Sequence, residues 1–197
     1  MVERIRTAFK MHNGNKASCL QSCEHPDFHV HDPPPPKAKG EVRLPCRVIT
    51  DGPLTKAYLH VRNDSKQPIY FALIDHCIYD DSNPSKCDCA LIRNENIYFV
   101  EFKNQEDKVG ATTLNPFASP GDCLNQLAAS IRDFYDRGIV KPGQTVYAYA
   151  SVGYPRHRPQ HGAHHQDQLS SLQRKVQEGQ PRQLRLRYHT ESELHIK

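Results

Sequence analysis

The segment 87–103 places the tightest constraint on how this chain of 197 residues can fold. Two apolar runs, 87–92 and 97–102, lie on either side of a short polar stretch. Apolar runs of this length separated by a two-residue turn predict a β-hairpin. A turn at residues 94–95 then sets the register of the two strands. It places Asp88 directly across from Glu101 on one face of the sheet.

Further short runs predict a sheet around this hairpin. From residue 41 to residue 102, the strand candidates with turn residues between them predict antiparallel pairing. Helices are predicted at residues 2–10, 119–138 and 166–177, the second with Ser119 as its N-cap and Gly138 as its stop. The order of strands and helices predicts an α/β (α+β) fold with a mixed sheet. In addition to the hairpin, the strand candidates are residues 42–48, 57–61, 69–74, 145–152, 184–188 and 193–196.

The first forty residues differ in composition from the rest. After the short helix, residues 13–40 are rich in Cys, His and Pro and contain four consecutive prolines at 33–36. Such a run favours an extended polyproline conformation and excludes a helix or a central strand. We therefore expect an irregular N-terminal arm over residues 1–40, followed by one domain over residues 41–197.

The facing acids carry the chemistry of the hairpin. Two carboxylates in this position repel each other unless a cation lies between them. Oxygen ligands without thiolate or imidazole favour Mg²⁺ or Mn²⁺. Lys103 follows on the face of Glu101, where an ammonium can orient a water and offset the charge of a transition state. Asp88, Glu101 and Lys103 together predict metal-assisted hydrolysis of a phosphodiester.

On these residues the segment resembles the PD-(D/E)xK nuclease superfamily. Asp88 begins one strand, and Glu101-Phe102-Lys103 ends the next after an apolar run. The resemblance covers about residues 69–153, and it departs from the family pattern at Cys87, where many members have Pro. It implies a restriction-endonuclease-like central sheet flanked by helices. It also implies that Asp88, Glu101 and the backbone carbonyl of Phe102 bind the metal and that Lys103 is the catalytic lysine.

The resemblance implies an enzyme: a Mg²⁺- or Mn²⁺-dependent endonuclease, with DNA as the expected substrate. A small catalytic domain with no recognition domain suits a role in antiviral defence or repair. Gln126, in the predicted helix 119–138, corresponds to a Gln that many relatives carry near the site. Asp75, at the end of the strand candidate 69–74, is a further ligand candidate and equally fits a turn. A homodimer suits cleavage of both strands of a duplex. An inactive nuclease-like module that only binds, or an ordinary surface hairpin, stays open as an alternative.

The arm contains a second pattern of metal-binding side chains. Cys19 and Cys23 are followed closely by His25 and His29, with His31 next along the chain. Two thiols and two imidazoles can bind Zn²⁺ tetrahedrally, although the spacing matches no common zinc finger. A small zinc-containing module that binds nucleic acid or protein is therefore an alternative function.

The net charge of +4 comes entirely from residues 154–197. This basic C-terminal extension follows the proposed catalytic core and suits an anionic partner such as nucleic acid. Arg156 and Arg158 are the leading candidates for phosphate contacts, and Arg185 and Arg187 share one face of the strand candidate 184–188. A solvated connector at 154–165 is the competing interpretation.

The expected location of the protein follows from its apolar runs, its first residues and its cysteine count. No apolar run reaches the length of a membrane-spanning helix, and residues 1–6 do not resemble a signal peptide. Seven cysteines cannot all pair within one chain. These features predict a cytoplasmic protein in a reducing compartment, with no membrane partner.

Overall fold

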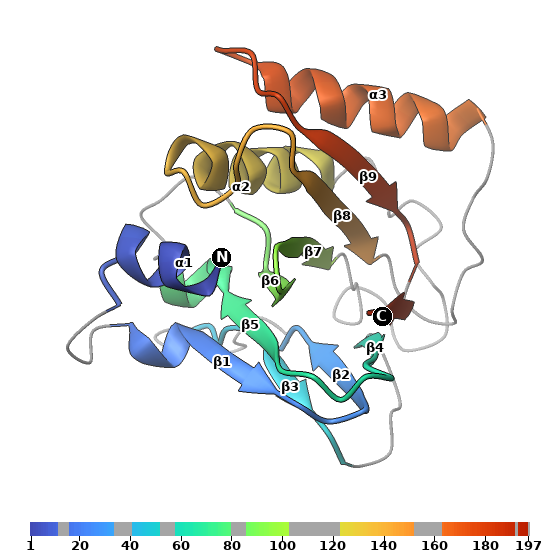
Figure 1. Ribbon diagram of the computed structural model, residues 1–197. Coiled ribbons are helices and arrows are strands. Elements are labelled where there is room, and N and C mark those ends of the chain that lie inside the picture. Colours follow the sequence, from blue (N-terminus) through green and yellow to red (C-terminus); the bar gives the residue numbers. More distant parts are fainter. Residues whose placement is uncertain are drawn as a thin grey trace.

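The hairpin lies in the middle of a six-stranded mixed sheet in the computed structural model (Figure 1). The structure describes residues 1–11, 16–33, 41–51, 58–79, 86–102, 123–151, 163–191 and 193–196. The strand order is β1-β5-β6-β7-β8-β9. The neighbours β1 and β5, β5 and β6, and β6 and β7 are antiparallel. β8 pairs with β7, and β9 with β8, in parallel after helical crossovers. The bounds are β1 Leu20–Cys23, β5 Ile69–Leu73, β6 Cys89–Arg93, β7 Asn96–Phe102, β8 Thr145–Ser151 and β9 Arg185–His189.

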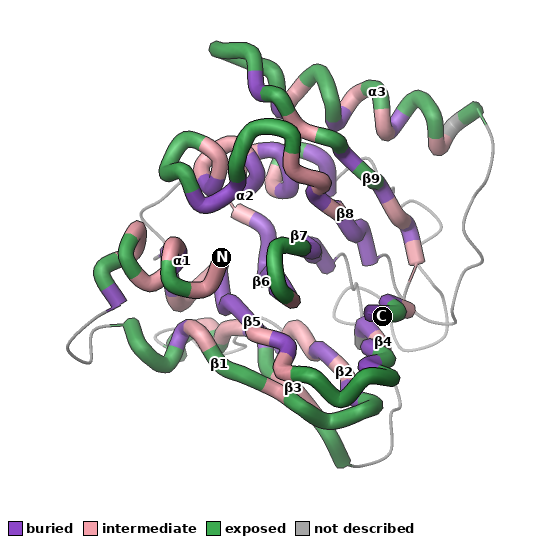
Figure 2. The backbone as a smooth tube through the Cα atoms, in the orientation of Figure 1, coloured by how far each residue is buried: buried purple, intermediate pink, exposed green. Residues whose placement is uncertain are grey.

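The register of the hairpin is the one that the sequence predicts. Cys89 pairs with Val100 and Arg93 with Asn96, and residues 94–95 form the turn. Asn94 has φ of +55°, the left-handed conformation that an asparagine tolerates at such a turn. β6 and β7 are buried at almost every position, as Figure 2 shows for the centre of the molecule. A strand buried on both faces has no freedom to shift its register.

Two helices cover one face of this sheet (Figure 1). α2 (Leu124–Asp136) connects β7 to β8, and α3 (Ala163–Gln177) lies against α2 between β8 and β9. Phe134 of α2 meets Phe99 of β7 edge to face, with ring centroids 5.1 Å apart. Gly138 ends α2 as expected: it has φ of +70°, and its N–H and that of Ile139 bond back to the last turn. The predicted cap at Ser119 lies outside the described residues, and Cys123 stands at the N-cap instead.

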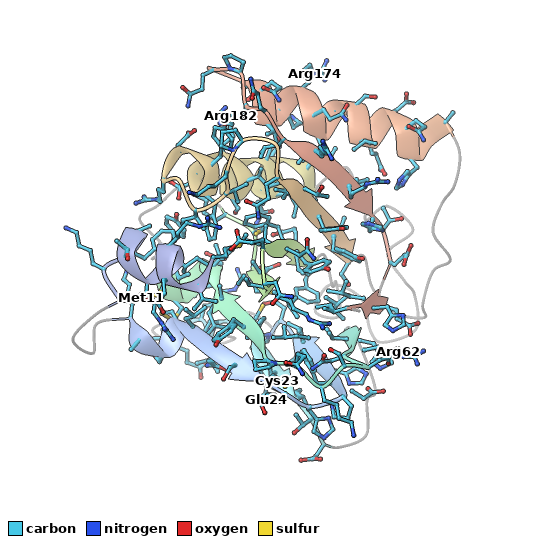
Figure 3. The ribbon with its side chains drawn as sticks, in the orientation of Figure 1. Met11, Cys23, Glu24, Arg62, Arg174 and Arg182 are labelled. Carbon is cyan, nitrogen blue, oxygen red and sulfur yellow. A yellow bond between two sulfur atoms is a disulfide. The ribbon has the colours of Figure 1, made fainter. Side chains whose placement is uncertain are left out.

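A buried arginine joins the two helices. Arg182, labelled in Figure 3, follows α3 and has a side chain only 5% exposed. Its guanidinium donates to both carboxylate oxygens of Asp136 on α2, at 3.0 and 2.8 Å. It also donates to the backbone carbonyls of Val176, Glu178 and Gln180. The carboxylate and these carbonyls of the protein therefore satisfy the buried guanidinium.

A smaller sheet packs on the other side of the molecule. Its four strands follow the order β10-β4-β2-β3. Of the strand candidate 42–48, only the last two residues lie in a strand, β3, and residues 42–46 form none. The bounds are β2 Asp27–His31, β3 Arg47–Ile49, β4 Tyr58–Arg62 and β10 Glu193–His195.

The N-terminal segment is part of both sheets, which differs from the expected irregular arm. After α1 (Val2–Ala8), β1 pairs with β5, and β2 pairs with β3 and β4. Phe28 and Val30 of β2 point into the core, where they are buried. Alternation of apolar and polar residues, rather than the spacing of Cys and His, is the signal that identifies β2.

A disulfide joins Cys19 to Cys77, whose Cα atoms lie 5.6 Å apart. It connects the short helix η1 (Ala17–Cys19) to the segment that follows β5. The other five cysteines are free. Disulfides are rare in reducing compartments, so this bond does not support the expected cytoplasmic setting. Among the described helices, none has the length and apolar character needed to cross a bilayer.

Candidate metal centre

The two predicted acids lie at the end of the hairpin remote from its turn. Asp88 immediately precedes β6 and is 5% exposed, and Glu101 near the end of β7 is 1% exposed. One carboxylate oxygen of Asp88 accepts a hydrogen bond of 2.6 Å from the backbone N–H of Phe102. The register places both acids at the same level of the hairpin, as the sequence predicts. Asp88 thus contacts Phe102 through the backbone N–H, and binding of a metal by the Phe102 carbonyl stays a prediction.

Helix α2 holds the chain that leads to Asp88. Gln126 donates a hydrogen bond of 3.2 Å to the carbonyl of Lys86, two residues before the acid. The buried hydroxyl of Ser130 accepts one of 2.8 Å from the N–H of Cys87. Gln126 thus supports the site through the backbone. The role of Ser130 could not be predicted, because nothing in the sequence of a helix marks a hydroxyl that accepts a hydrogen bond from a distant segment.

Asp75 lies beside the same residues. Its backbone N–H and that of Ile74 both donate to the carbonyl of Asp88, at 3.2 and 3.1 Å. Its carboxylate accepts a hydrogen bond from the N–H of His76 and contacts the His76 ring at 3.0 Å. His76 has φ of +57°, so it occupies a turn. The carboxylate of Asp75 therefore caps this turn, while its backbone contacts Asp88, and its role as a metal ligand stays a prediction.

A third carboxylate comes from the segment that the sequence analysis assigned to the arm. Ligand atoms of Asp32, Cys46 and Asp88 all lie within 4.8 Å of one another. The thiol of Cys46 donates toward Asp32 at 3.8 Å, and the guanidinium of Arg43 lies 3.9 Å from the same carboxylate. No motif spacing links residues 32 and 88, since only the packing of the two sheets brings them together. We call Asp32, Asp75, Asp88 and Glu101 the acidic cluster.

Burial and mutual repulsion dominate the electrostatics of the acidic cluster. Burial raises the pKa of Asp88 well above its ordinary value, and the charges of Glu101 and Asp32 raise it further. The Phe102 N–H acts in the opposite direction. Burial also raises the pKa of Asp32, against the influence of Arg43. Carboxylates in this state favour either a proton or a bound cation.

The donor set fits a hard divalent cation. Burial raises the pKa of the Cys46 thiol, so this residue remains an S–H donor rather than a thiolate. The remaining donors are carboxylate oxygens, which Mg²⁺ and Mn²⁺ prefer. Cys87 and Cys89 are fully buried, as expected for small core residues.

The predicted cationic residues are not gathered at the acids. Lys103, Arg156 and Arg158 lie outside the described residues. Arg185 and Arg187 are exposed on β9 and alternate with buried Leu186, as expected. Arg187 is in register with Tyr147 and Tyr98, which lie on the sheet face opposite to that of Glu101. These two arginines therefore do not face the acidic cluster.

The predicted zinc ligands are not brought together either. Cys19 is bonded to Cys77 and cannot offer a thiolate. His25 contacts the backbone of Asp27, while His29 points from β2 toward His60 of β4. The four-residue zinc set over 19–29 is therefore wrong for the structure, because the disulfide uses its first thiol.

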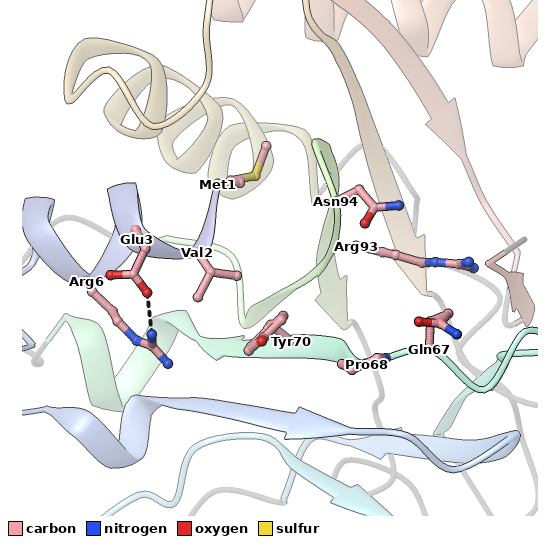
Figure 4. Close-up of a pocket in the computed structure, with 9 residues that line it drawn as sticks. All are labelled: Met1, Val2, Glu3, Arg6, Gln67, Pro68, Tyr70, Arg93 and Asn94. Atoms are coloured by element: carbon pink, nitrogen blue, oxygen red, sulfur yellow. Dashed lines mark hydrogen bonds and ion pairs between the residues drawn. The ribbon is translucent and has the colours of Figure 1, made fainter.

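The pocket in Figure 4 lies away from the acids. It has a volume of about 490 Å³ and is formed by α1, the start of β5 and the hairpin turn. Arg6 and Arg93 provide its positive charge, and Arg6 is paired with Glu3. No member of the acidic cluster lines it.

No protein-family model, curated protein or solved structure matches this chain. The interpretation of the acidic cluster therefore depends on its own geometry and chemistry.

Proposed function

We propose that this protein is a metal-dependent nuclease that hydrolyses phosphodiester bonds of nucleic acid, with DNA as the expected substrate. The observation that carries the proposal is the buried pair Asp88 and Glu101, held at one level of the hairpin with Asp32 nearby. A fold gains nothing in stability by burying like charges. Such an arrangement is instead typical of a site that binds a cation.

Several features of the chain support this assignment. A mixed sheet flanked by helices agrees with the restriction-endonuclease-like fold that the motif implies. Asp88, Glu101 and Asp32 are the proposed metal ligands, and Asp75 lies next to them. Gln126 and Ser130 position the backbone before Asp88. Lys103, two residues after Glu101, remains the proposed catalytic lysine on the strength of the motif.

Each residue has a distinct part in the proposed reaction. A bound Mg²⁺ or Mn²⁺ supplies Lewis-acid polarisation of the phosphate and a bound water of lowered pKa. Asp88 and Glu101 provide the negative charge that holds the ion. The Phe102 N–H fixes one oxygen of Asp88 and leaves the other for the ion. Lys103 orients the attacking water and offsets the charge that develops on the phosphate.

The test is cleavage of supercoiled plasmid and of short duplexes in Mg²⁺ and in Mn²⁺. Asp88→Asn, Glu101→Gln and Lys103→Ala are each expected to abolish cleavage. Asp167→Asn, which changes an exposed carboxylate of α3, is the matched control and is expected to cleave normally. Binding of DNA without cleavage in either metal would identify an inactive nuclease-like module instead. Cleavage that survives in all three variants would contradict the proposal.

Two further properties belong to this proposal. A homodimer would let one active site per chain cut both strands, and light scattering on the purified protein measures its mass. We also propose a cytoplasmic location, which fractionation of cells that express the protein tests, and a thiol count on the recovered protein reports the state of the disulfide. In denaturant, seven thiols are expected if Cys19 and Cys77 are reduced, and five if the disulfide persists.

A further inference from the structure

The solvent-facing side of the smaller sheet carries an unusual number of imidazoles. Residues of β2 and β4 alternate, with Phe28, Val30, Leu59 and Val61 buried in the core. The opposite side therefore presents polar residues from three neighbouring strands. Arg62, labelled in Figure 3 at the end of β4, belongs to it. We call this set the histidine face: Asp27, His29 and His31 of β2, His60 and Arg62 of β4, and Glu193 and His195 of β10.

His60 lies at the centre of the histidine face. His29 is its direct partner across β2 and β4, and Glu193 is its partner across β4 and β10. The imidazole rings of His29 and His60 stack with centroids 4.6 Å apart and planes only 8° apart. Nε2 of His60 lies 2.7 Å from a carboxylate oxygen of Asp27. Nδ1 of the same ring lies 3.7 Å from a carboxylate oxygen of Glu193.

We propose that Asp27, His29 and His60 bind a divalent transition-metal ion, with Zn²⁺ the expected one. One ligand atom from each residue lies within 4.8 Å of the other two. Two imidazoles and one carboxylate form a donor set typical of zinc, whereas Mg²⁺ prefers oxygen alone. Bond lengths of about 2.0–2.2 Å require ligand atoms about 3.4 Å apart, so the side chains need move by only about 1 Å. This movement requires rotation about the side-chain bonds of these residues, because the His29 and His60 rings are stacked nearly parallel.

The surroundings also suit a metal ion. His60 has a side chain only 13% exposed, and the strands on both sides fix its position. When Nε2 binds the ion, Nδ1–H points toward Glu193, a carboxylate able to orient the ring. Asp27 is 57% exposed, which leaves an open side for a water as the fourth ligand. The ion would connect β2 to β4.

The competing explanation is a simple hydrogen bond between His60 and Asp27 on an exposed sheet. That bond requires neither His29 nor a second carboxylate beside the other ring nitrogen. A metal ion requires His29 as well, so removal of His29 separates the two explanations. This inference does not depend on the proposed nuclease activity, because its residues belong to the smaller sheet and are not members of the acidic cluster.

The test uses the full chain without an affinity tag, stripped with a chelator and titrated with Zn²⁺ by calorimetry. We expect about one equivalent bound. His29→Gln and His60→Gln should each weaken binding at least tenfold. His195→Gln is the matched control, because this residue lies on the same face but pairs with Asp64, and it should bind as the wild type does. Circular dichroism confirms that each variant is folded.

Co²⁺ in place of Zn²⁺ identifies the ligands directly. The expected spectrum has weak visible bands and lacks the intense near-ultraviolet band of thiolate bound to cobalt. That thiolate band would place the ion at one of the free cysteines and overturn the inference. Absence of Zn²⁺ binding by the wild type would overturn it too, as would unchanged affinity in both His29→Gln and His60→Gln.

Discussion

The acidic cluster and the histidine face are two candidate cation sites built on opposite principles. The acidic cluster gathers carboxylates from four separate segments, with Asp88 and Glu101 buried, and the charges of Glu101 and Asp32 add to the effect of burial in raising the pKa of Asp88. The histidine face places its ligands on adjacent strands at the surface, where the sheet register alone brings His29 and His60 together. Burial of charged carboxylates lowers the stability of the fold at the acidic cluster until a cation or a proton binds there. The histidine face carries almost none of this cost.

The ligand atoms also differ between the acidic cluster and the histidine face. Hard oxygen donors in a closed site suit Mg²⁺ or Mn²⁺, and imidazoles on an open face suit Zn²⁺. The buried Arg182 completes the comparison, because that charge is satisfied by Asp136 and three carbonyls of the protein. A buried charge therefore indicates a bound ion only where the protein does not neutralise it.

The largest expected effect is the separation of the two sites by mutation. Asp88→Asn should lower the rate of cleavage in Mg²⁺ by about a thousandfold, because the ion loses a charged ligand. It should leave Zn²⁺ affinity at the histidine face unchanged. His60→Gln should do the reverse, with cleavage within about twofold of the wild type. If either substitution impairs both readouts in a folded protein, the two sites are not separate.

The next largest effect concerns the buried charge of Arg182, which Asp136 neutralises. Arg182→Ala should lower the free energy of unfolding by about 2–4 kcal/mol, since Asp136 and several carbonyls lose a charged donor. Denaturation by guanidinium chloride measures the loss. Added Mg²⁺ or Zn²⁺ should not restore it. Arg174→Ala, on the exposed side of α3, is the control and should change stability by less than about 0.5 kcal/mol.

The sequence predicts the first site much better than the second. Local pairing determines the hairpin, so the turn at residues 94–95 is enough to place Asp88 across from Glu101. Helix α2 follows in the same way from its apolar stripe and from Gly138. Asp32 and Cys46 could not be predicted, because only contact between the two sheets brings them to Asp88. A motif describes residues at fixed spacing along the chain, so it does not predict contacts between segments that are far apart in the sequence.

His29 shows a different kind of failure. Its alternation with Phe28 and Val30 marks a strand, yet the nearby Cys19 and Cys23 suggested a compact zinc motif. Strand geometry carries His29 to a partner that lies thirty-one positions later in the chain. The residue type indicated metal binding, whereas the choice of partners required the sheet.

A smaller effect tests whether the acids repel each other without a cation. Burial raises the pKa of Asp88 above its ordinary value of 3.8, so the folded protein holds a proton that the unfolded chain releases. Stability from this group is therefore present at low pH and is lost as the pH rises above 3.8 toward the raised pKa. In chelator at neutral pH, Asp88→Asn should raise the free energy of unfolding by about 1 kcal/mol.

The pH dependence provides the control for that prediction. The advantage of Asp88→Asn over the wild type should shrink as the pH falls, because the wild-type acid then takes up its proton. Saturating Mg²⁺ should reverse the order, since only the charged wild type gains from the ion. A wild type that is more stable than the variant at neutral pH without metal would show that the acids do not destabilise the fold.

The smallest effect concerns how the acidic cluster is held in place. Gln126→Ala removes one hydrogen bond to the Lys86 carbonyl and should cost about 1 kcal/mol in stability. Because that carbonyl lies two residues before Asp88, cleavage should fall several-fold while DNA binding is retained. Asn125→Ala, an exposed neighbour on the same helix, should change neither property. The ratio of cleavage to binding in the two variants separates support of Asp88 from a general loosening of α2. The histidine face lies on the smaller sheet and Gln126 lies on α2, so the Zn²⁺ affinity of the histidine face should be the same in both variants.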